Sequence, residues 1–332
     1  CIFNTENEKN KDRLEMYIRL VIECLYTKNK GKRRVEMKLR ALAKINLGLD
    51  VTGKRPDGYH EVRMIMQNIQ MFDQLELEKS DQPEIRIETN LSFLPCNENN
   101  LVYRAADLLM KEFDIREGLK IKLTKFIPVA AGMAGGSSDA AAALVGVNRM
   151  FHLGLSTKEL MDRGVKIGAD VPYCVMRGTA LAEGIGEKLT KLPPMPFCYV
   201  LIGKPGINVS TKFVYGNLNL EKIEHHPDID GIRAAIERKD LKGIASKMGN
   251  VLELVTCPAY PVIDEIKALM LREGALNAMM SGSGPTVFGL FDDRDTAQRA
   301  CDRLRESGLA RQTFLTTISE SGGGRLGGYR AK

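Results

Sequence analysis

Apolar and polar positions alternate along several parts of this chain, as they do in a half-buried β-strand. Runs of this kind cover residues 38–51 and 119–127. Elsewhere apolar residues recur at helical spacing, and the segments that follow Asn100 and Ser156 begin after side chains that cap helices well. The pattern therefore predicts a protein of mixed strands and helices.

The same patterns place the remaining elements. In the first half we expect further strands at 74–78 and 84–88, and helices at 101–113, after a glycine-rich stretch near residue 135, and from Ser156. In the second half we expect strands at 197–202, 276–280, 286–291 and 312–318, and helices at 211–215, 231–237, 240–255, 261–273 and 295–307. If the helices between the first two of these strands count as one crossover, the second half has the β-α-β-β-α-β order of a ferredoxin-like fold. The composition breaks at Leu192-Pro-Pro-Met-Pro196, where we place a domain boundary.

A glycine-rich stretch joins the strand that ends near Ile127 to a helix that opens with four alanines. Glycine has no Cβ, so backbone N–H groups can approach a ligand closely, and the first turn of the helix favours an anion. Ser137 and Ser138 add hydroxyl donors. The stretch predicts a phosphate cradle, and an equally simple interpretation is a tight turn in which Ser137 caps the helix. No lysine follows the glycines, so this is not a Walker A loop.

Three other places carry candidate chemistry. Lys44 and Asn46 lie on one face of the first strand, where they indicate either a solvated sheet face or a site. The turn-rich loop before His60 presents Tyr59 beside an imidazole, which favours ligand contact. Asp170, in Gly-Ala-Asp-Val-Pro, has the position of a turn former or an N-cap.

Composition sets the general class. The chain has 332 residues, of which 44% are hydrophobic and 27% charged, as in ordinary globular proteins. No apolar run approaches the length of a membrane span, and the seven cysteines are scattered without metal-ligand spacing. We therefore expect a cytoplasmic protein without a membrane partner, a zinc site or a disulfide framework.

The net charge of +6 is unevenly spread. Residues 1–36 hold nine Lys/Arg against six Asp/Glu, so half of the excess lies there. Such a run can bind nucleic acid, but a solvated tail is the more common case, and we expect no nucleic-acid partner. We expect residues 1–36 to be an N-terminal extension outside the fold, the functional domain to begin near Met37, and residues 320–332 to form a flexible tail.

The motifs together resemble the GHMP kinase superfamily, named for galactokinase, homoserine kinase, mevalonate kinase and phosphomevalonate kinase. The glycine-rich stretch is similar to its ATP-phosphate loop, although Met133 and Ala134 stand where leucine and glycine are more usual. Ser281-Gly-Ser-Gly-Pro-Thr286 is similar to its third motif. Ala43-Lys-Ile-Asn-Leu47, Asp57-Gly-Tyr-His60 and Gly168-Ala-Asp-Val-Pro172 resemble the family within it that acts on 4-diphosphocytidyl-2-C-methylerythritol.

The resemblance implies an α+β, two-domain GHMP kinase fold. It implies a ribosomal-protein-S5-domain-2-like, ATP-binding domain over residues 37–192 and a ferredoxin-like domain over residues 193–319. The implied reaction transfers the γ-phosphoryl group of ATP, with Mg²⁺, to the 2-hydroxyl of the cytidyl substrate in the non-mevalonate isoprenoid pathway. Monomers and homodimers are both compatible with it.

The resemblance also implies roles for single residues. Asp170 matches the catalytic aspartate and Lys44 the catalytic lysine. The nucleotide-binding residues it implies are Pro128, Val129, Ala130, Ala131, Gly132, Met133, Ala134, Gly135, Gly136, Ser137 and Ser138. The substrate-binding residues it implies are Asn46, Tyr59, His60, Thr211 and Tyr215, with Tyr59 stacking and His60 bonding to cytosine.

Two alternatives remain open from the sequence. Another small-molecule kinase of the superfamily, for mevalonate or homoserine, would keep the phosphate loop but gives no reason for Asp57-Gly-Tyr-His60. A non-catalytic nucleotide-binding or RNA-binding protein would use the basic leader, and it would leave Lys44 and Asp170 without a purpose.

Overall fold

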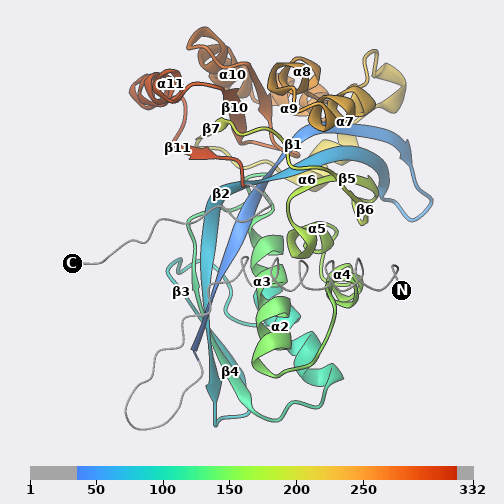
Figure 1. The fold of residues 1–332 in the computed structure, drawn as a ribbon, viewed down its shortest axis with the longest axis vertical. Helices are drawn as coiled ribbons and strands as arrows, with labels where there is room; N and C mark the ends of the chain where they lie inside the picture. The colour runs from blue at the N-terminus through green and yellow to red at the C-terminus, as the bar shows by residue number, and fades with distance from the viewer. Residues whose placement is uncertain (1–35, 320–332) are drawn as a thin grey trace, which may run out of the picture.

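Two β-sheets form the framework of residues 36–319, the part of the chain that the computed structural model describes (Figure 1). The first sheet has seven strands in the order β3-β4-β2-β1-β8, with β5 pairing with β2 and β6 pairing with β5. Its strands are β1 (Glu36–Lys54), β2 (His60–Ser80), β3 (Ile85–Thr89), β4 (Gly118–Thr124), β5 (Thr179–Gly184), β6 (Lys188–Lys191) and β8 (Gly249–Asn250). The expected leader over residues 1–36, apart from Glu36, and the expected tail lie outside the described residues.

The long antiparallel pair β1 and β2 is the spine of the molecule. Residues on opposite faces of these strands belong to two different hydrophobic cores. On β2, Met64 and Met66 face one core, and Ile65 and Ile69 face the other. Because both faces of β2 are covered from Met64 to Ile69, its sequence lacks alternation there, and only residues 74–78 were predicted as strand.

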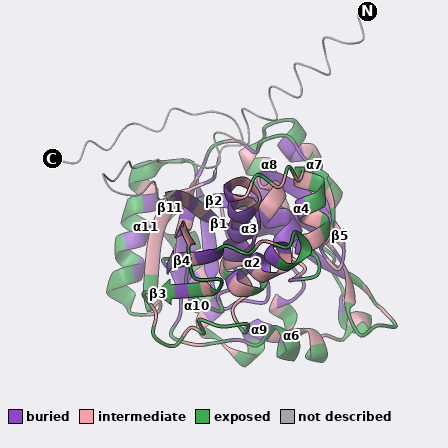
Figure 2. Cartoon of the chain, turned by 90° about the horizontal axis from the view of Figure 1, so that it is seen from below, coloured by how far each residue is buried: buried purple, intermediate pink, exposed green. Residues whose placement is uncertain are grey.

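Helices cover one face of the spine at the end where β3 and β4 lie (Figure 1). These are α2 (Leu101–Glu112), α3 (Gly135–Met150), α4 (Thr157–Gly164) and α5 (Val171–Met176). The side chain of Asn100 caps α2, and Ser156 with Glu159 forms the predicted capping box of α4. Buried residues concentrate around α3 and the spine (Figure 2).

The second sheet has four antiparallel strands in the order β11-β7-β10-β9. They are β7 (Tyr199–Lys204), β9 (Asn277–Met280), β10 (Val287–Phe291) and β11 (Gln312–Thr317). The helices of this half are α6 (Thr211–Asn217), α7 (Ile229–Glu237), α8 (Leu241–Lys247), α9 (Glu253–Ala259), α10 (Val262–Arg272) and α11 (Arg294–Ser307), with a short 3₁₀ turn at Leu220–Lys222. This is the strand order of the predicted ferredoxin-like fold, so the predicted α+β class is confirmed.

Some elements differ from the prediction. The helix expected over residues 240–255 is wrong, because Gly249 and Asn250 leave the helical path and pair in parallel with Gly48 and Leu49 of β1. This splits the segment into α8, β8 and α9. Strands β5 and β6 were not predicted, since alanine and glycine make up much of β5.

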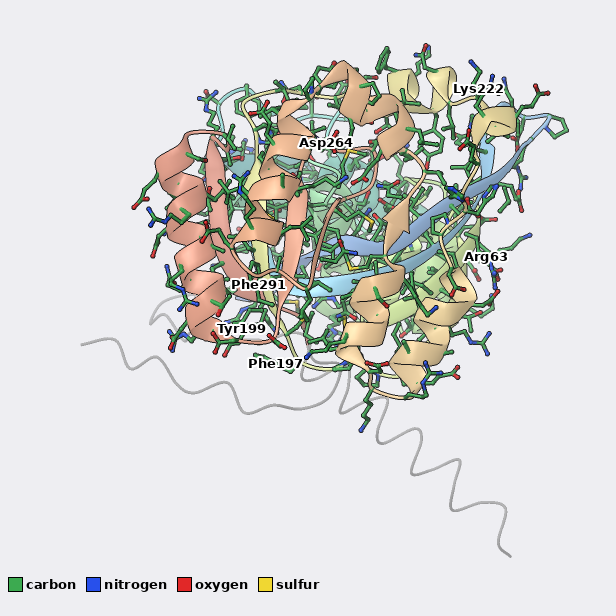
Figure 3. All side chains as sticks on the ribbon, turned by 90° about the horizontal axis from the view of Figure 1, so that it is seen from above. Arg63, Phe197, Tyr199, Lys222, Asp264 and Phe291 are labelled. Carbon is green, nitrogen blue, oxygen red and sulfur yellow. The ribbon has the colours of Figure 1, made fainter. Side chains whose placement is uncertain are left out.

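The second half stays attached to the spine at several points. Besides the β8 pairing, the guanidinium of Arg63 on β2 donates two hydrogen bonds of 2.7 Å to the carboxylate of Asp230 on α7 (Arg63 is labelled in Figure 3). Because residues beyond 192 contribute to the first sheet, a domain boundary at residue 192 stays a prediction. No helix within residues 36–319 is long and apolar enough to cross a membrane.

Candidate active site

The predicted phosphate loop lies between β4 and α3. Helix α3 begins at Gly135, and Ala134 occupies its N-cap with a left-handed backbone (φ 54°) and no side-chain capping bond. The alternative in which Ser137 caps the helix is therefore wrong. The first-turn N–H groups of α3 have no side-chain cap of the chain's own, which leaves this helix end suited to an anion.

A cavity of about 850 Å³ opens against this loop. The predicted residues that line it are Lys44, Tyr59, His60, Pro128, Val129, Ala130, Ala131, Gly132, Ala134, Gly135, Gly136, Ser137, Asp170, Thr211 and Tyr215. The structure thus brings together most of the residues chosen from the sequence, although they come from segments up to 171 positions apart (Lys44 to Tyr215).

Three of the predicted residues lie behind the cavity wall. Met133 is buried in a hydrophobic core, and Asn46 is fully buried on β1. The hydroxyl of Ser138 donates a 2.7 Å hydrogen bond to the carbonyl of Leu42 and so fastens α3 to the spine. These side chains support the site and do not line it.

Lys44 and Asp170 lie next to each other in the wall of the cavity. The Lys44 ammonium is 3.9 Å from Oδ2 of Asp170 and donates a 2.8 Å hydrogen bond to Oδ1 of Asn46. Asp170 stands at the N-cap of α5 but makes no capping bond, so its carboxylate is not used by the helix. The backbone N–H of Lys44 donates to the carbonyl of Met133, which sets the pair directly against the phosphate loop.

The loop between β9 and β10 closes the site from the second sheet. The hydroxyl of Ser281 donates a 3.0 Å hydrogen bond to the carbonyl of Gly132. A Cβ on Gly132 would lie 2.1 Å from the carbonyl oxygen of Ser281, and the φ of Gly132 is +70°, so only glycine fits there. Thr211 at the start of α6 shares a 2.9 Å hydroxyl–hydroxyl hydrogen bond with Ser283 of the same loop.

Aromatic side chains also line the cavity. The Tyr59 side chain is 59% exposed, on a turn held by the Asp57 carboxylate, which accepts from the Tyr59 N–H. The rings of His60 and Tyr215 are 5.2 Å apart and tilted by 42°. Burial and then the charge of Lys54 lower the pKa of His60, so its imidazole is neutral at pH 7 and offers one donor and one acceptor.

Sequence reasoning missed other residues of the cavity. One group lies in the segment before α2 and comprises Leu94, Pro95, Asn99, Asn100 and Leu101. Lys125 and Asp139 also line the cavity and bond to each other beneath the phosphate loop. The sequence shows a charged residue on each side of the glycine-rich stretch, but it does not indicate that these two side chains meet.

The described part of the chain has no group of three or more His, Cys, Asp or Glu residues that could hold a metal ion. A Mg²⁺ ion that arrives with a nucleotide does not need such a group, because phosphate oxygens and water supply most of its ligands. The donor set is therefore compatible with a nucleotide-bound magnesium ion.

Two family models match the chain. The GHMP kinases N terminal domain matches residues 100–178, and the GHMP kinases C terminal domain matches residues 232–309. These ranges cover the phosphate loop with Asp170, and the loop that closes the site.

Known proteins resemble most of the chain. It is 59% identical over 280 residues to 4-diphosphocytidyl-2-C-methyl-D-erythritol kinase of Lachnospira eligens, which covers 84% of this chain and 97% of that protein. It is 51% identical over 285 residues to the protein of that name from Clostridium perfringens, with 86% and 99% covered.

Solved structures also resemble the fold of this chain. A crystal structure of 4-(cytidine 5'-diphospho)-2C-methyl-D-erythritol kinase matches with a TM-score of 0.74 and 32% identity over 87% of this chain and 100% of the other. Homoserine kinase from Cytophaga hutchinsonii matches with a TM-score of 0.71 at 21% identity, covering 89% and 97%, which shows the shared fold alone.

Proposed function

The chain belongs to the 4-diphosphocytidyl-2-C-methyl-D-erythritol kinase family of the GHMP kinases, and we propose that Lys44 and Asp170 catalyse its reaction. That reaction is transfer of the γ-phosphoryl group of ATP to the 2-hydroxyl of 4-diphosphocytidyl-2-C-methyl-D-erythritol, a step of non-mevalonate isoprenoid synthesis. The observation that carries the residue roles is the 3.9 Å approach of Lys44 to Asp170 in the wall of the cavity that the glycine loop also lines.

The phosphates of ATP bind along the loop from Pro128 to Ser138. Gly135 and Gly136 have no side chains, so their backbone N–H groups can donate to the phosphates. The first turn of α3 adds a partial positive charge. Ser137 lies on the same wall and adds a hydroxyl donor. The remaining residues of the loop shape its backbone, with Ser138 and Met133 anchored in the protein interior.

Asp170 accepts the proton of the substrate hydroxyl, or orients that hydroxyl toward the γ-phosphorus. The Lys44 ammonium, 3.9 Å from the Asp170 carboxylate, offsets negative charge on the transferred group. Asn46 fixes the direction of the Lys44 ammonium through their 2.8 Å hydrogen bond. Such an arrangement acts mainly by alignment and charge, as phosphoryl transfer requires.

The cytidyl end of the substrate binds near Tyr59. Its exposed ring provides a stacking surface, and the neutral imidazole of His60 can donate to and accept from the edge of cytosine. Tyr215 supports the His60 ring at 5.2 Å, and Thr211, whose hydroxyl is hydrogen-bonded to Ser283, also lines the cavity.

Mg²⁺ accompanies ATP, and when bound it neutralises phosphate charge. We further propose that the protein acts as a monomer or homodimer in the cytoplasm, where its charged nucleotide substrates are confined. Nucleic acid has no part in this function. Binding of a duplex at physiological salt, measured with and without residues 1–36, tests that point.

One assay separates the candidate activities. The protein is incubated with Mg·ATP and, in separate reactions, with the cytidyl substrate, mevalonate and homoserine, and formation of ADP is followed. We expect turnover with the cytidyl substrate only. Preferential turnover of mevalonate or homoserine would contradict the proposed substrate roles of Tyr59 and His60.

A further inference from the structure

Three charged side chains are buried together beneath the phosphate loop. Lys125, just after β4, bonds to Asp139 of α3 at 2.6 Å and makes a second, short contact with Asp73 of β2. All three residues are less than 10% exposed. We call Asp73, Lys125 and Asp139 the buried charge cluster.

The cluster touches the surface on which the triphosphate is proposed to lie. Lys125 and Asp139 line the same cavity as the glycine loop. A Cβ on Gly135 would lie only 3.2 Å from the Lys125 ammonium, so the loop backbone rests against this charge. Because the cluster is buried, a change in its charge alters the electrostatic potential at the phosphate loop.

The two carboxylates of the cluster are not equivalent. Asp73 accepts from the backbone N–H groups of Phe126 and Ile127, at 2.6 and 2.8 Å, as well as from Lys125. Both carboxylate oxygens of Asp73 thus accept hydrogen bonds from N–H donors. Asp139 accepts from Lys125 through Oδ2, whereas its buried Oδ1 has no hydrogen-bond partner among the described residues. A proton in this cluster therefore belongs on Asp139.

The net charge of the buried charge cluster also favours a proton on Asp139. One ammonium can neutralise one carboxylate, so the cluster carries a net charge of about −1 when both aspartates are ionised and about zero when Asp139 is protonated. Burial, and to a smaller extent the charge of Asp73, raise the pKa of Asp139 to about 8 despite the opposing effect of Lys125. After burial, Lys125 beside β4 and Asp73 on β2 have the largest effects on the pKa of Asp139.

We propose that Asp139 takes up a proton when the triphosphate of ATP binds, so that the buried charge cluster is neutral beneath the phosphates. An ionised Asp139 repels the negatively charged triphosphate on the other side of the glycine loop, whereas a protonated Asp139 does not. Nucleotide affinity then falls as the pH rises above the point where the free enzyme loses this proton. The inference rests on the proposed function, because it requires the triphosphate to bind at the glycine loop.

Calorimetry with the full-length protein tests the proposal. Mg·ATP is titrated without the second substrate at pH 8.5, in Tris and in a buffer with a lower ionisation enthalpy, and the dissociation constant is also measured from pH 7 to 9. We expect uptake of a substantial fraction of one proton at pH 8.5, and a dissociation constant that rises about five- to tenfold between pH 7 and 9. Asp139→Asn keeps the shape of the protonated side chain, and it should bind Mg·ATP at pH 9 about as well as the wild type does at pH 7.

A matched control neutralises an aspartate elsewhere. Asp162, exposed on α4 and 3.1 Å from Lys158, is paired with a lysine as Asp139 is. Asp162→Asn should leave both the proton uptake and the pH dependence unchanged. Infrared difference spectra between pH 7 and 9 give a second measurement, because a protonated carboxyl band present at pH 7 should be missing from Asp139→Asn.

The outcomes separate the two proposals. No binding of Mg·ATP by the folded wild-type protein would overturn the proposed function. Binding without proton uptake at pH 8.5, or the same uptake and pH dependence in Asp139→Asn, would overturn only the role of Asp139. Absence of the protonated carboxyl band from the wild-type protein at pH 7 would also overturn the role of Asp139.

Discussion

The ammonium of Lys44 lies 3.9 Å from the Asp170 carboxylate, yet its hydrogen bond goes to Asn46 at 2.8 Å. The two groups are thus within ion-pair distance, but no hydrogen bond joins them directly. A substrate hydroxyl that donates to Asp170 can be approached by the same ammonium. We therefore expect the reaction to require the charged side chains of both residues.

Replacement of either residue should stop turnover without unfolding the protein. We expect Asp170→Asn and Lys44→Met to lower kcat by about 10³-fold, because the first removes the proton acceptor and the second removes the charge that stabilises the transferred group. Steady-state ADP formation with the cytidyl substrate measures the loss, and thermal unfolding checks the fold. Near-normal kcat in either folded variant would contradict the role given to that residue.

The close approach of the two glycine loops should tolerate no side chain at Gly132. We expect Gly132→Ala to raise the KM for ATP at least about tenfold and to destabilise the protein, because its Cβ would lie 2.1 Å from the Ser281 carbonyl oxygen. Gly154 is the matched control, since its φ is +72° but nothing lies within 4 Å of a Cβ there. Gly154→Ala should cost only about 1 kcal/mol in urea unfolding and leave the KM for ATP unchanged. Equal effects of the two substitutions on the KM for ATP would contradict a specific clash between residue 132 and Ser281.

Much of this architecture could be predicted from the sequence, because each motif carried its own physical signal. The capping residues Asn100 and Ser156 marked real helix starts, and the second half has the predicted strand order. Lys44 and Asp170 are 126 positions apart, and only the resemblance linked them before the structure brought their side chains to 3.9 Å.

What the sequence could not provide depends on tertiary contacts. The two-residue strand β8 exists because Gly249 and Asn250 pair with β1, and so short a strand leaves no periodicity. Residues 64–69 of β2 are buried on both faces, which removes the alternation that identifies a strand. The buried charge cluster joins positions 73, 125 and 139, and no local pattern predicts which aspartates a lysine will contact.

The exposed ring of Tyr59 should matter for substrate affinity and little for the chemical step. We expect Tyr59→Ala to raise the KM for the cytidyl substrate about tenfold, with kcat changed less than about threefold, because base stacking contributes about 1–3 kcal/mol. Leu271→Ala is the control, since Leu271 is 46% exposed on α10 and is not part of the cavity lining. A fall in kcat with an unchanged KM would argue against stacking as the task of Tyr59.

Asp139 should also leave a signature in the stability of the ligand-free protein. Its pKa is about 8 in the folded state, above the value of about 3.9 for an aspartate in an unfolded chain. The folded protein therefore holds an extra proton between these pH values, and this group makes the free energy of unfolding fall as the pH rises toward 8.

Asp139→Asn lacks the titration, so its stability relative to wild type should increase by at most about 1.4 kcal/mol per pH unit from pH 5 to 8 and then level off. Urea unfolding of both proteins at each pH measures the difference, with Asp162→Asn expected to show no such trend. A constant difference between Asp139→Asn and wild type would mean that Asp139 is ionised in the folded protein throughout this range.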